Sequence, residues 1–171
     1  IEPIAGVGGL DNGCCFTHAR NGWGGLVEAA GGVNIGSQLL PGATGNISVE
    51  KIISMNPDYY LMTGSKGPGK GTAIIPFGYN VPQADVVSAF NALLARQGVS
   101  SIPAVVAGHT GALYHHFYNN PYNIIAIETL SKIFYPTQFK DVDPLADYHQ
   151  LITQFTHIPD DKVILSYTPE K

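Results

Sequence analysis

The segment from residue 47 to residue 64 constrains the fold most, because it contains a complete helix, turn and strand with clear boundaries. Ser48 is a residue type that caps the free N–H groups at the start of a helix. Asn56-Pro57 ends the helix, since the residue before a proline is pushed out of the α region. Residues 58–63 form an apolar run of the length of a buried strand, and Gly64 opens a loop at its carboxyl end. In open α/β sheets, ligands bind at that end.

Helices and strands alternate along the rest of the chain, with no internal repeat. This alternation predicts an α/β fold, a three-layer lobe with a mainly parallel central sheet flanked by helices. The expected strands are 4–9, 33–35 and 163–165, with a hairpin over 103–114; the expected helices are 22–30, 84–97, 124–134 and 144–156; the expected loops are 8–18, 39–46 and 65–71.

The composition fits one domain with a sizeable core, because the chain has 171 residues of which 44% are hydrophobic and 13% charged. A net charge of −4 with only nine Lys and Arg residues argues against nucleic acid or an anionic membrane as partner. No run approaches the length of a membrane span, and residues 1–4 lack the features of a signal peptide. Since the first residue is not methionine, we expect a processed or trimmed piece of a longer protein.

Cys14 and Cys15 are the only cysteines and are adjacent, so no ordinary disulfide can join distant parts of the chain. Three interpretations are open. The pair is two small, partly buried residues, as cysteines commonly are. Alternatively, the pair forms a strained vicinal disulfide, or it ligates a soft metal together with His18.

Candidates for catalysis are few, because the sequence has no Gly-x-Ser-x-Gly elbow, no His-Glu-x-x-His motif and no two-pair cysteine site. Loop 8–18 can present backbone N–H groups to an anion, but it lacks the Gly-Lys-Ser/Thr ending of a phosphate loop. Tyr114, His116 and Tyr118 alternate onto one side of an extended segment, where phenol or imidazole groups could ligate iron or stack on a flat chelate. The alternative for each histidine is a hydrogen-bonded imidazole near the surface.

Four further side chains have two interpretations each. Lys66 and Lys70 follow the strand end at Gly64, where they would meet an anionic ligand, but they are also typical of a solvated surface loop. Trp23 begins a predicted helix and either contacts a ligand or anchors the packing. Glu50 lies in a first helical turn, and the helix dipole alone would explain it.

Three segments carry a resemblance to a known family: residues 47–64, 28–35 and 116–123. Their order and spacing are similar to the carboxyl-terminal lobe of bacterial ABC-transporter solute-binding proteins, whose two lobes are joined by one rigid helix. The resemblance covers nearly the whole chain. It implies that residues 1–171 are a single C-terminal lobe, without the N-terminal lobe and the linking helix. It also implies a periplasmic protein, or one lipid-anchored to the outer face of the cytoplasmic membrane.

Proteins of this class take up ferric siderophores, haem, cobalamin, oxyanions, or nickel and cobalt chelates. The resemblance therefore implies a non-enzymatic binding protein, expected to be a monomer without a cofactor, that hands its ligand to an ABC permease. An iron chelate, either a siderophore or haem, is the first expectation; molybdate, tungstate or a nickel or cobalt chelate is the alternative. The resemblance also implies that Glu50 docks onto arginines of the permease. Because the other cleft wall would lie on the missing lobe, we expect the chain alone to bind weakly or not at all.

The predicted ligand cleft combines the loop 9–18, the loop 64–71 and the segment 114–119. Its predicted ligand-binding residues are Asn12, Cys14, Cys15, His18, Trp23, Lys66, Lys70, His116, Tyr118 and Asn119. A hypothesis of a different class is a small metal-dependent enzyme built on Cys14, Cys15, His18 and His116.

Overall fold

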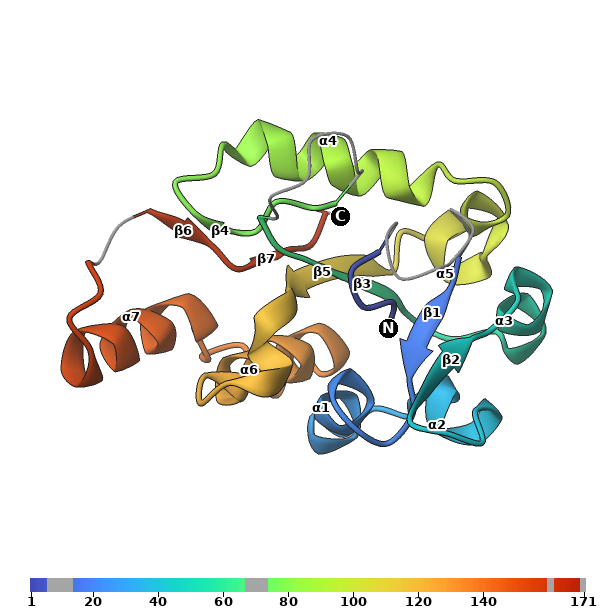
Figure 1. Ribbon diagram of the computed structural model, residues 1–171, viewed down its shortest axis with the longest axis horizontal. Coiled ribbons are helices and arrows are strands. Elements are labelled where there is room, and N and C mark those ends of the chain that lie inside the picture. Colours follow the sequence, from blue (N-terminus) through green and yellow to red (C-terminus); the bar gives the residue numbers. More distant parts are fainter. Residues whose placement is uncertain (6–13, 67–73, 160–161, 170–171) are drawn as a thin grey trace.

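The central sheet of the protein is built from three strands. The computed structural model describes residues 1–5, 14–66, 74–159 and 162–169. Strands β3 (Tyr60–Gly64) and β5 (Thr110–Tyr114) run parallel, and β7 (Ser166–Tyr167) pairs antiparallel with β5, in the order β3-β5-β7. Glu2 adds a parallel bridge to Met62 on β3. The sheet is therefore parallel except where β7 joins it (Figure 1).

Helices cover both faces of this sheet and produce the three layers seen in Figure 1. One face is covered by α4 (Gln83–Leu94) and α5 (Pro103–Val106), and the other by α1 (Trp23–Ala29) and α6 (Asn123–Phe134), with α7 (Pro144–Phe155) packed against α6.

The remaining elements are short. Two small antiparallel ladders and their neighbouring helices flank the central sheet: β1 (Phe16–His18) with β2 (Thr44–Asn46), β4 (Gly78–Tyr79) with β6 (Val163–Ile164), the helices α2 (Ile35–Leu39) and α3 (Val49–Met55), and the 3-10 turns η1 (Val99–Ser101) and η2 (His115–Asn119).

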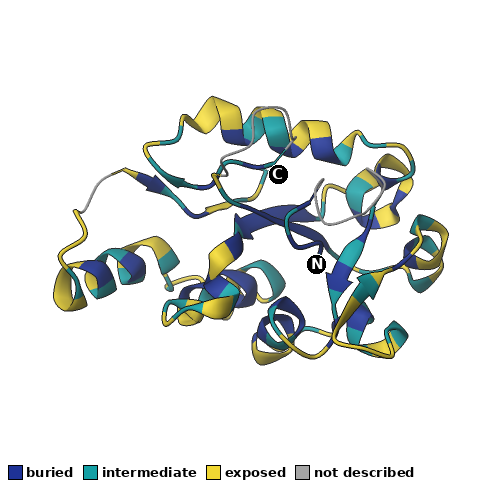
Figure 2. Cartoon of the chain, viewed as in Figure 1, coloured by how far each residue is buried: buried dark blue, intermediate teal, exposed yellow. Residues whose placement is uncertain are grey.

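The alternation of side chains along the strands separates two hydrophobic cores. Met62 and Ala112 point to one face and pack with the buried side chains of α4, including Phe90. Leu61 and Leu113 point to the other face and pack with α1 and α6. Figure 2 shows strands β3 and β5 buried almost throughout, while the helices are buried only along their inner sides. None of the helices within the described residues has the length and hydropathy needed to cross a membrane.

The predicted fold class is confirmed, and so is the central helix, turn and strand. Ser48 caps α3 by accepting a hydrogen bond from the Lys51 backbone N–H at 3.3 Å. Asn56 ends α3 in the left-handed conformation, with φ 46°. The helices expected over 22–30, 84–97, 124–134 and 144–156 are observed as α1, α4, α6 and α7. The expected last strand is also observed, as β6 and β7.

The strand expected at 33–35 is wrong. Asn34 precedes the short helix α2, and its buried side-chain amide donates to the carbonyl oxygens of His18 and Ala19, at 2.8 and 3.0 Å. These hydrogen bonds of the Asn34 amide therefore connect the start of α2 to the end of β1. The loop expected at 39–46 contains strand β2, whose three residues carry no hydrophobic pattern. Likewise, residues 16–18 of the expected first loop form β1.

The hairpin expected over 103–114 is wrong in its first arm. Pro103 occupies the first turn of α5, where its missing N–H costs no hydrogen bond, so residues 103–106 are helical. The segment 115–119 is a 3-10 turn and not extended. At the amino end, pairing occurs at Glu2, while Ile4 sits in a turn with φ 45°, so the first strand does not start at Ile4. Residues 6–9 of that expected strand lie outside the described residues.

Candidate ligand-binding end of the sheet

The carboxyl ends of β3 and β5 lie side by side, because Gly64 pairs with Tyr114 in the parallel register. Beyond each of these two strand ends, the polypeptide continues into polar residues. Lys66 follows β3 with an exposed side chain, and its backbone N–H donates to the Phe77 carbonyl oxygen at 2.9 Å. Strand β5 runs directly into η2, which carries His116. The register therefore brings two of the predicted regions to one edge of the sheet.

His115 anchors η2 to the sheet below it. Its imidazole is buried, and its Nδ1 is 2.8 Å from the Thr63 hydroxyl of β3. Its carbonyl oxygen accepts a hydrogen bond from the Trp23 indole at 3.2 Å. Burial, and to a smaller extent the neighbouring His116 and His18, lower the pKa of His115 to about 4. His115 is thus neutral at pH 7 and positions the exposed residues that follow it.

His18 and Tyr118 meet edge to face at the same end of the sheet, with their ring centroids 5.5 Å apart. Both side chains are half-buried. The Trp23 backbone N–H donates to His18 Nδ1 at 3.2 Å, so Nδ1 carries no proton and Nε2 carries it. Burial, followed by the nearby α-amino group of Ile1, lowers the pKa of His18. His18 therefore offers a neutral imidazole with an Nε2–H donor beside the Tyr118 ring.

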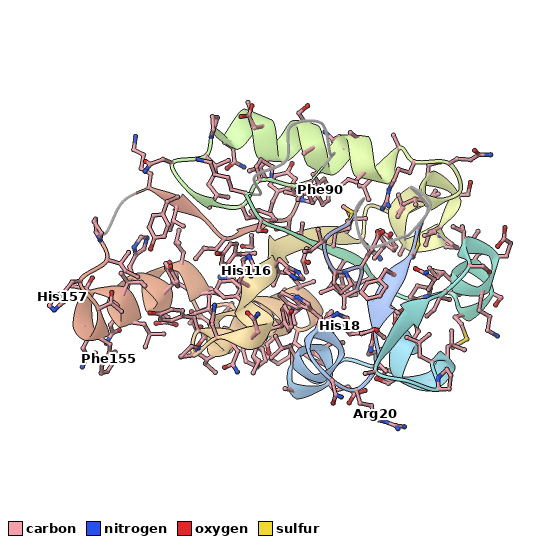
Figure 3. The ribbon with its side chains drawn as sticks, viewed as in Figure 1. His18, Arg20, Phe90, His116, Phe155 and His157 are labelled. Carbon is pink, nitrogen blue, oxygen red and sulfur yellow. A yellow bond between two sulfur atoms is a disulfide. The ribbon has the colours of Figure 1, made fainter. Side chains whose placement is uncertain are left out.

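His116 and Asn119 are the exposed residues of η2. The His116 ring lies 5.4 Å from that of Tyr114, which is half-buried. In Figure 3, His116 and His18 lie near the middle of the molecule, whereas His157 lies at the outer end near α7. Imidazole, phenol and amide groups therefore form a polar and aromatic surface at this edge.

The structure separates the other predicted residues from this surface. Trp23 is completely buried in the core shared by α1 and α6, which favours its interpretation as a packing anchor. Cys14 and Cys15 contact Tyr60 at the amino end of β3, away from His18. The four residues of the enzyme hypothesis are therefore not assembled into one site. Asn12 and Lys70 lie outside the described residues.

The sulfur atoms of Cys14 and Cys15 are paired as a vicinal disulfide, and Cys15 is buried. Next to the disulfide lies a buried cluster of charged and polar side chains that the sequence did not predict. Glu2 is buried and forms a bidentate ion pair with Arg96, with Nη1 2.9 Å from Oε1 and Nη2 2.6 Å from Oε2. The Tyr60 hydroxyl donates to the same carboxylate. Burial, then the charge of Glu2, raises the pKa of Tyr60 well above its usual value, so its hydroxyl stays protonated.

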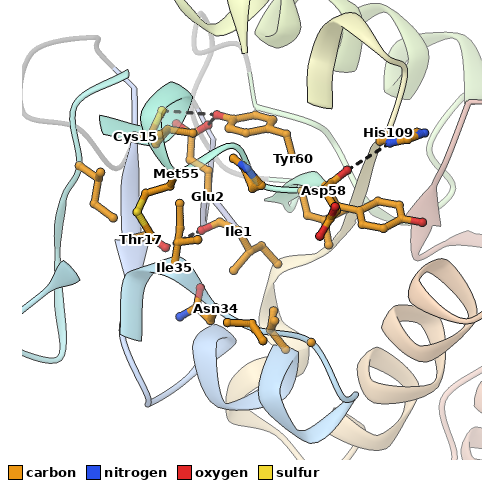
Figure 4. A pocket seen from close by; sticks show the side chains of 18 of the residues that line it. Ile1, Glu2, Cys15, Thr17, Asn34, Ile35, Met55, Asp58, Tyr60 and His109 are labelled. Carbon is orange, nitrogen blue, oxygen red and sulfur yellow. Dashed lines mark hydrogen bonds between the residues drawn. The ribbon is translucent and has the colours of Figure 1, made fainter. Parts of the chain in front are cut away.

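A cavity of about 720 Å³ opens beside this group (Figure 4). It lies at the amino ends of β3 and β5, opposite to the edge where the sequence places the ligand. Its walls combine apolar side chains of α1, α3 and α6 with polar groups, including Asn34 and His109. His109 Nδ1 is 3.2 Å from the Asp58 carbonyl oxygen.

Glu50 lies in the first turn of α3 with its side chain in solvent. Hydrogen bonds from its own backbone N–H and from Ser48 lower its pKa. Its carboxylate is therefore ionised at pH 7 and available to a cationic partner.

The fold is that of about half of a TroA-like periplasmic binding protein. A structure of the TroA-like periplasmic binding protein FepB from Veillonella parvula matches with a TM-score of 0.86 at 24% identity, over 99% of this chain and 49% of that chain. A periplasmic solute binding protein from Veillonella parvula DSM 2008 matches with a TM-score of 0.57 at 17% identity, over 85% of this chain and 41% of that one.

Neither the scan against protein-family models nor the search of curated proteins found a match. The chain spans about half the length of the two structures, and their identities to it are low enough that they establish the fold alone. The lobe fold that the sequence resemblance implied is confirmed.

Proposed function

We propose that the chain is the C-terminal lobe of a periplasmic or lipid-anchored solute-binding protein that serves an ABC importer. The observation that carries the proposal is the clustering of His18, Tyr118, His116 and Asn119 at the carboxyl edge of the sheet, with Lys66 on the adjoining strand end. In an open α/β sheet this edge is where ligands bind. Such a receptor captures its ligand and releases it to the permease, and carries out no chemical step.

The proposed ligand is an iron chelate, a ferric siderophore or haem. Tyr118 and His116 supply phenol and imidazole groups, which suit iron as ligands and aromatic chelates as stacking partners. Lys66 supplies a positive charge that suits an anionic chelate. Molybdate, tungstate and nickel or cobalt chelates are the competing ligands, since backbone N–H groups and imidazoles also suit them.

This proposal is tested by titrating several candidate ligands into the longest natural form of the protein that contains residues 1–171. Calorimetric titration with a ferric siderophore, haem, molybdate and a nickel–histidine complex should give saturable one-to-one binding for one iron chelate. Replacing Tyr118 or His116 with Ala should weaken that binding about tenfold each, which is about 1.4 kcal/mol. His157→Ala, a matched exposed histidine near α7, should leave it unchanged. Binding of molybdate or the nickel complex alone would reassign the ligand, and no binding across the panel would contradict the receptor role.

The proposal also predicts what residues 1–171 do alone. Because the second cleft wall would lie on the other lobe, this chain should bind the same ligand at least about 100-fold more weakly, a loss of about 2.7 kcal/mol or more. Tight one-to-one binding by residues 1–171 would show that the lobe is a complete receptor.

Glu50 is proposed to dock onto arginines of the permease. Glu50→Lys should reduce ligand uptake by the reconstituted importer while leaving ligand affinity unchanged, because the charge-assisted contact is lost. Glu28→Lys, which reverses an exposed charge on α1, is the matched control. Equal uptake by both variants would place the permease contact elsewhere.

A further inference from the structure

The amino end of β3 carries a group of potential metal ligands that the proposed receptor function does not use. One carboxylate oxygen of Glu2 and the sulfur atoms of Cys14 and Cys15 lie within 4.8 Å of one another. We propose that the dithiol form of this group binds one thiophilic divalent cation of the zinc class. The two thiolates and the Glu2 carboxylate would be its protein ligands.

The donor set fits such a cation. Two thiolates and a carboxylate are ligands that zinc accepts in a tetrahedral site, with bonds of about 2.3 Å to sulfur and about 2.1 Å to oxygen. These bonds place the ligand atoms about 3.5 to 3.8 Å apart, so the two sulfur atoms separate onto the cation once their disulfide is reduced, while the Glu2 oxygen already lies within 4.8 Å of both. His18 contributes nothing here, because its ring packs against Tyr118 instead.

A surrounding shell already orients these ligands. The Tyr60 hydroxyl lies 3.5 Å from the sulfur of Cys14 and 3.6 Å from that of Cys15, and it donates to Glu2. Arg96 holds both oxygens of the same carboxylate. Groups that hydrogen-bond to metal ligands in this way fix their orientation and tune the affinity of the site.

The charges also balance. The Glu2 carboxylate and the Arg96 guanidinium cancel each other, and two thiolates cancel one divalent cation. The loaded site is therefore neutral overall, which a buried position requires. Binding releases the two thiol protons to the solvent, so the reaction converts one cation and two thiols into one complex and two protons.

The cavity of about 720 Å³ provides the route of entry. Glu2, Cys15 and Tyr60 all line it, and Figure 4 shows them together at one wall. A cation entering through this cavity would meet Glu2 and Cys15 at its wall, with Cys14 next to Cys15 in the chain, and would keep a fourth position open toward the cavity. This site is separate from the proposed ligand cleft, so its failure would leave the proposed function untouched.

Zinc titration of residues 1–171 tests the proposal. The chain is reduced with a phosphine, freed of metal with a chelator and titrated anaerobically against a chromophoric zinc indicator, with the unreduced chain in parallel. The reduced chain should bind one zinc, and the unreduced chain none. Calorimetry in buffers of different ionisation enthalpy should show release of about two protons per zinc. Cobalt in place of zinc should give a thiolate-to-metal charge-transfer band.

Variants identify the ligands. The double variant Cys14→Ser with Cys15→Ser should lose stoichiometric binding, and Tyr60→Phe should weaken it about 10- to 100-fold as an outer-shell change. His157→Ala, the matched control for adventitious histidine binding, should bind like the parent chain. Comparing reduced with unreduced parent chain needs no variant, so the test holds even if a variant fails to fold. Failure of the reduced chain to bind zinc, or equal binding by the double Ser variant, would overturn the proposal.

Discussion

Replacing Arg96 with Met should destabilise the protein strongly, because it leaves a buried carboxylate without its partner. The side chains of Arg96 and Glu2 are 16% and 4% exposed, and they are joined by two hydrogen bonds of 2.9 and 2.6 Å. Arg96 also donates from Nε to the Leu93 carbonyl oxygen at 2.8 Å, at the end of α4. Methionine keeps most of the side-chain volume but provides none of these donors.

The expected loss is about 3 kcal/mol in the free energy of unfolding. Removing one partner of a buried ion pair costs about 3 to 5 kcal/mol, whereas an exposed pair contributes about 0 to 1 kcal/mol. The lower end of the first range applies, because Arg96 borders solvent and water can partly replace its hydrogen bonds to Glu2. Most of the loss arises from the uncompensated charge on Glu2, since its remaining side-chain donor within the described residues is the Tyr60 hydroxyl.

Urea unfolding at pH 7, followed by circular dichroism, measures this loss. The double variant Glu2→Gln with Arg96→Met should recover at least about half of it, because the uncompensated charge is gone. Arg20→Met, at an exposed position before α1, is the matched control and should change stability by less than about 0.5 kcal/mol. A loss below about 1 kcal/mol for Arg96→Met, or no recovery in the double variant, would refute the reasoning.

Two further predictions concern the core and the pH response. His115 is neutral in the fold with a pKa of about 4, against an ordinary value near 6.5. Protonation therefore favours the unfolded chain. The free energy of unfolding should fall by about 1 to 2 kcal/mol from pH 7 to pH 5 through this group, and the fall measured by urea unfolding should be smaller by that amount in His115→Gln. Gly24→Ala should destabilise by about 1 to 3 kcal/mol, because the added Cβ would collide with the Ala19 carbonyl oxygen; Gly42→Ala has open space and should be nearly neutral in thermal unfolding.

Local signals were sufficient to predict the central unit of the fold. The Ser48 cap, the Asn56-Pro57 stop and the apolar run after them each act within a few residues, and each is found where expected. The long helices were also predictable, because α4 and α6 repeat buried residues at helical spacing. In these segments the sequence and the tertiary structure favour the same conformation.

Short segments were not predictable in the same way. A run of three or four apolar residues, such as Ala104-Val105-Val106, fits a buried strand as well as a helical turn. Its conformation depends on the turn that Pro103 initiates and on the burial of Ala104. Strand β2 has no hydrophobic pattern at all, and it exists because β1 offers it a partner.

The two ends of β3 show why one candidate site was found from the sequence and the other was missed. At the carboxyl end, the candidate residues Lys66 and His116 each lie two residues after a strand, so the register of two parallel strands is enough to bring those segments together. At the amino end, Glu2 and Arg96 are 94 residues apart, and Arg96 lies two residues after α4, where an arginine looks like an ordinary solvated residue at a helix end. Only the docking of α4 against the sheet buries their charges together. A charged pair of this kind carries no local signal, so its position must come from the structure.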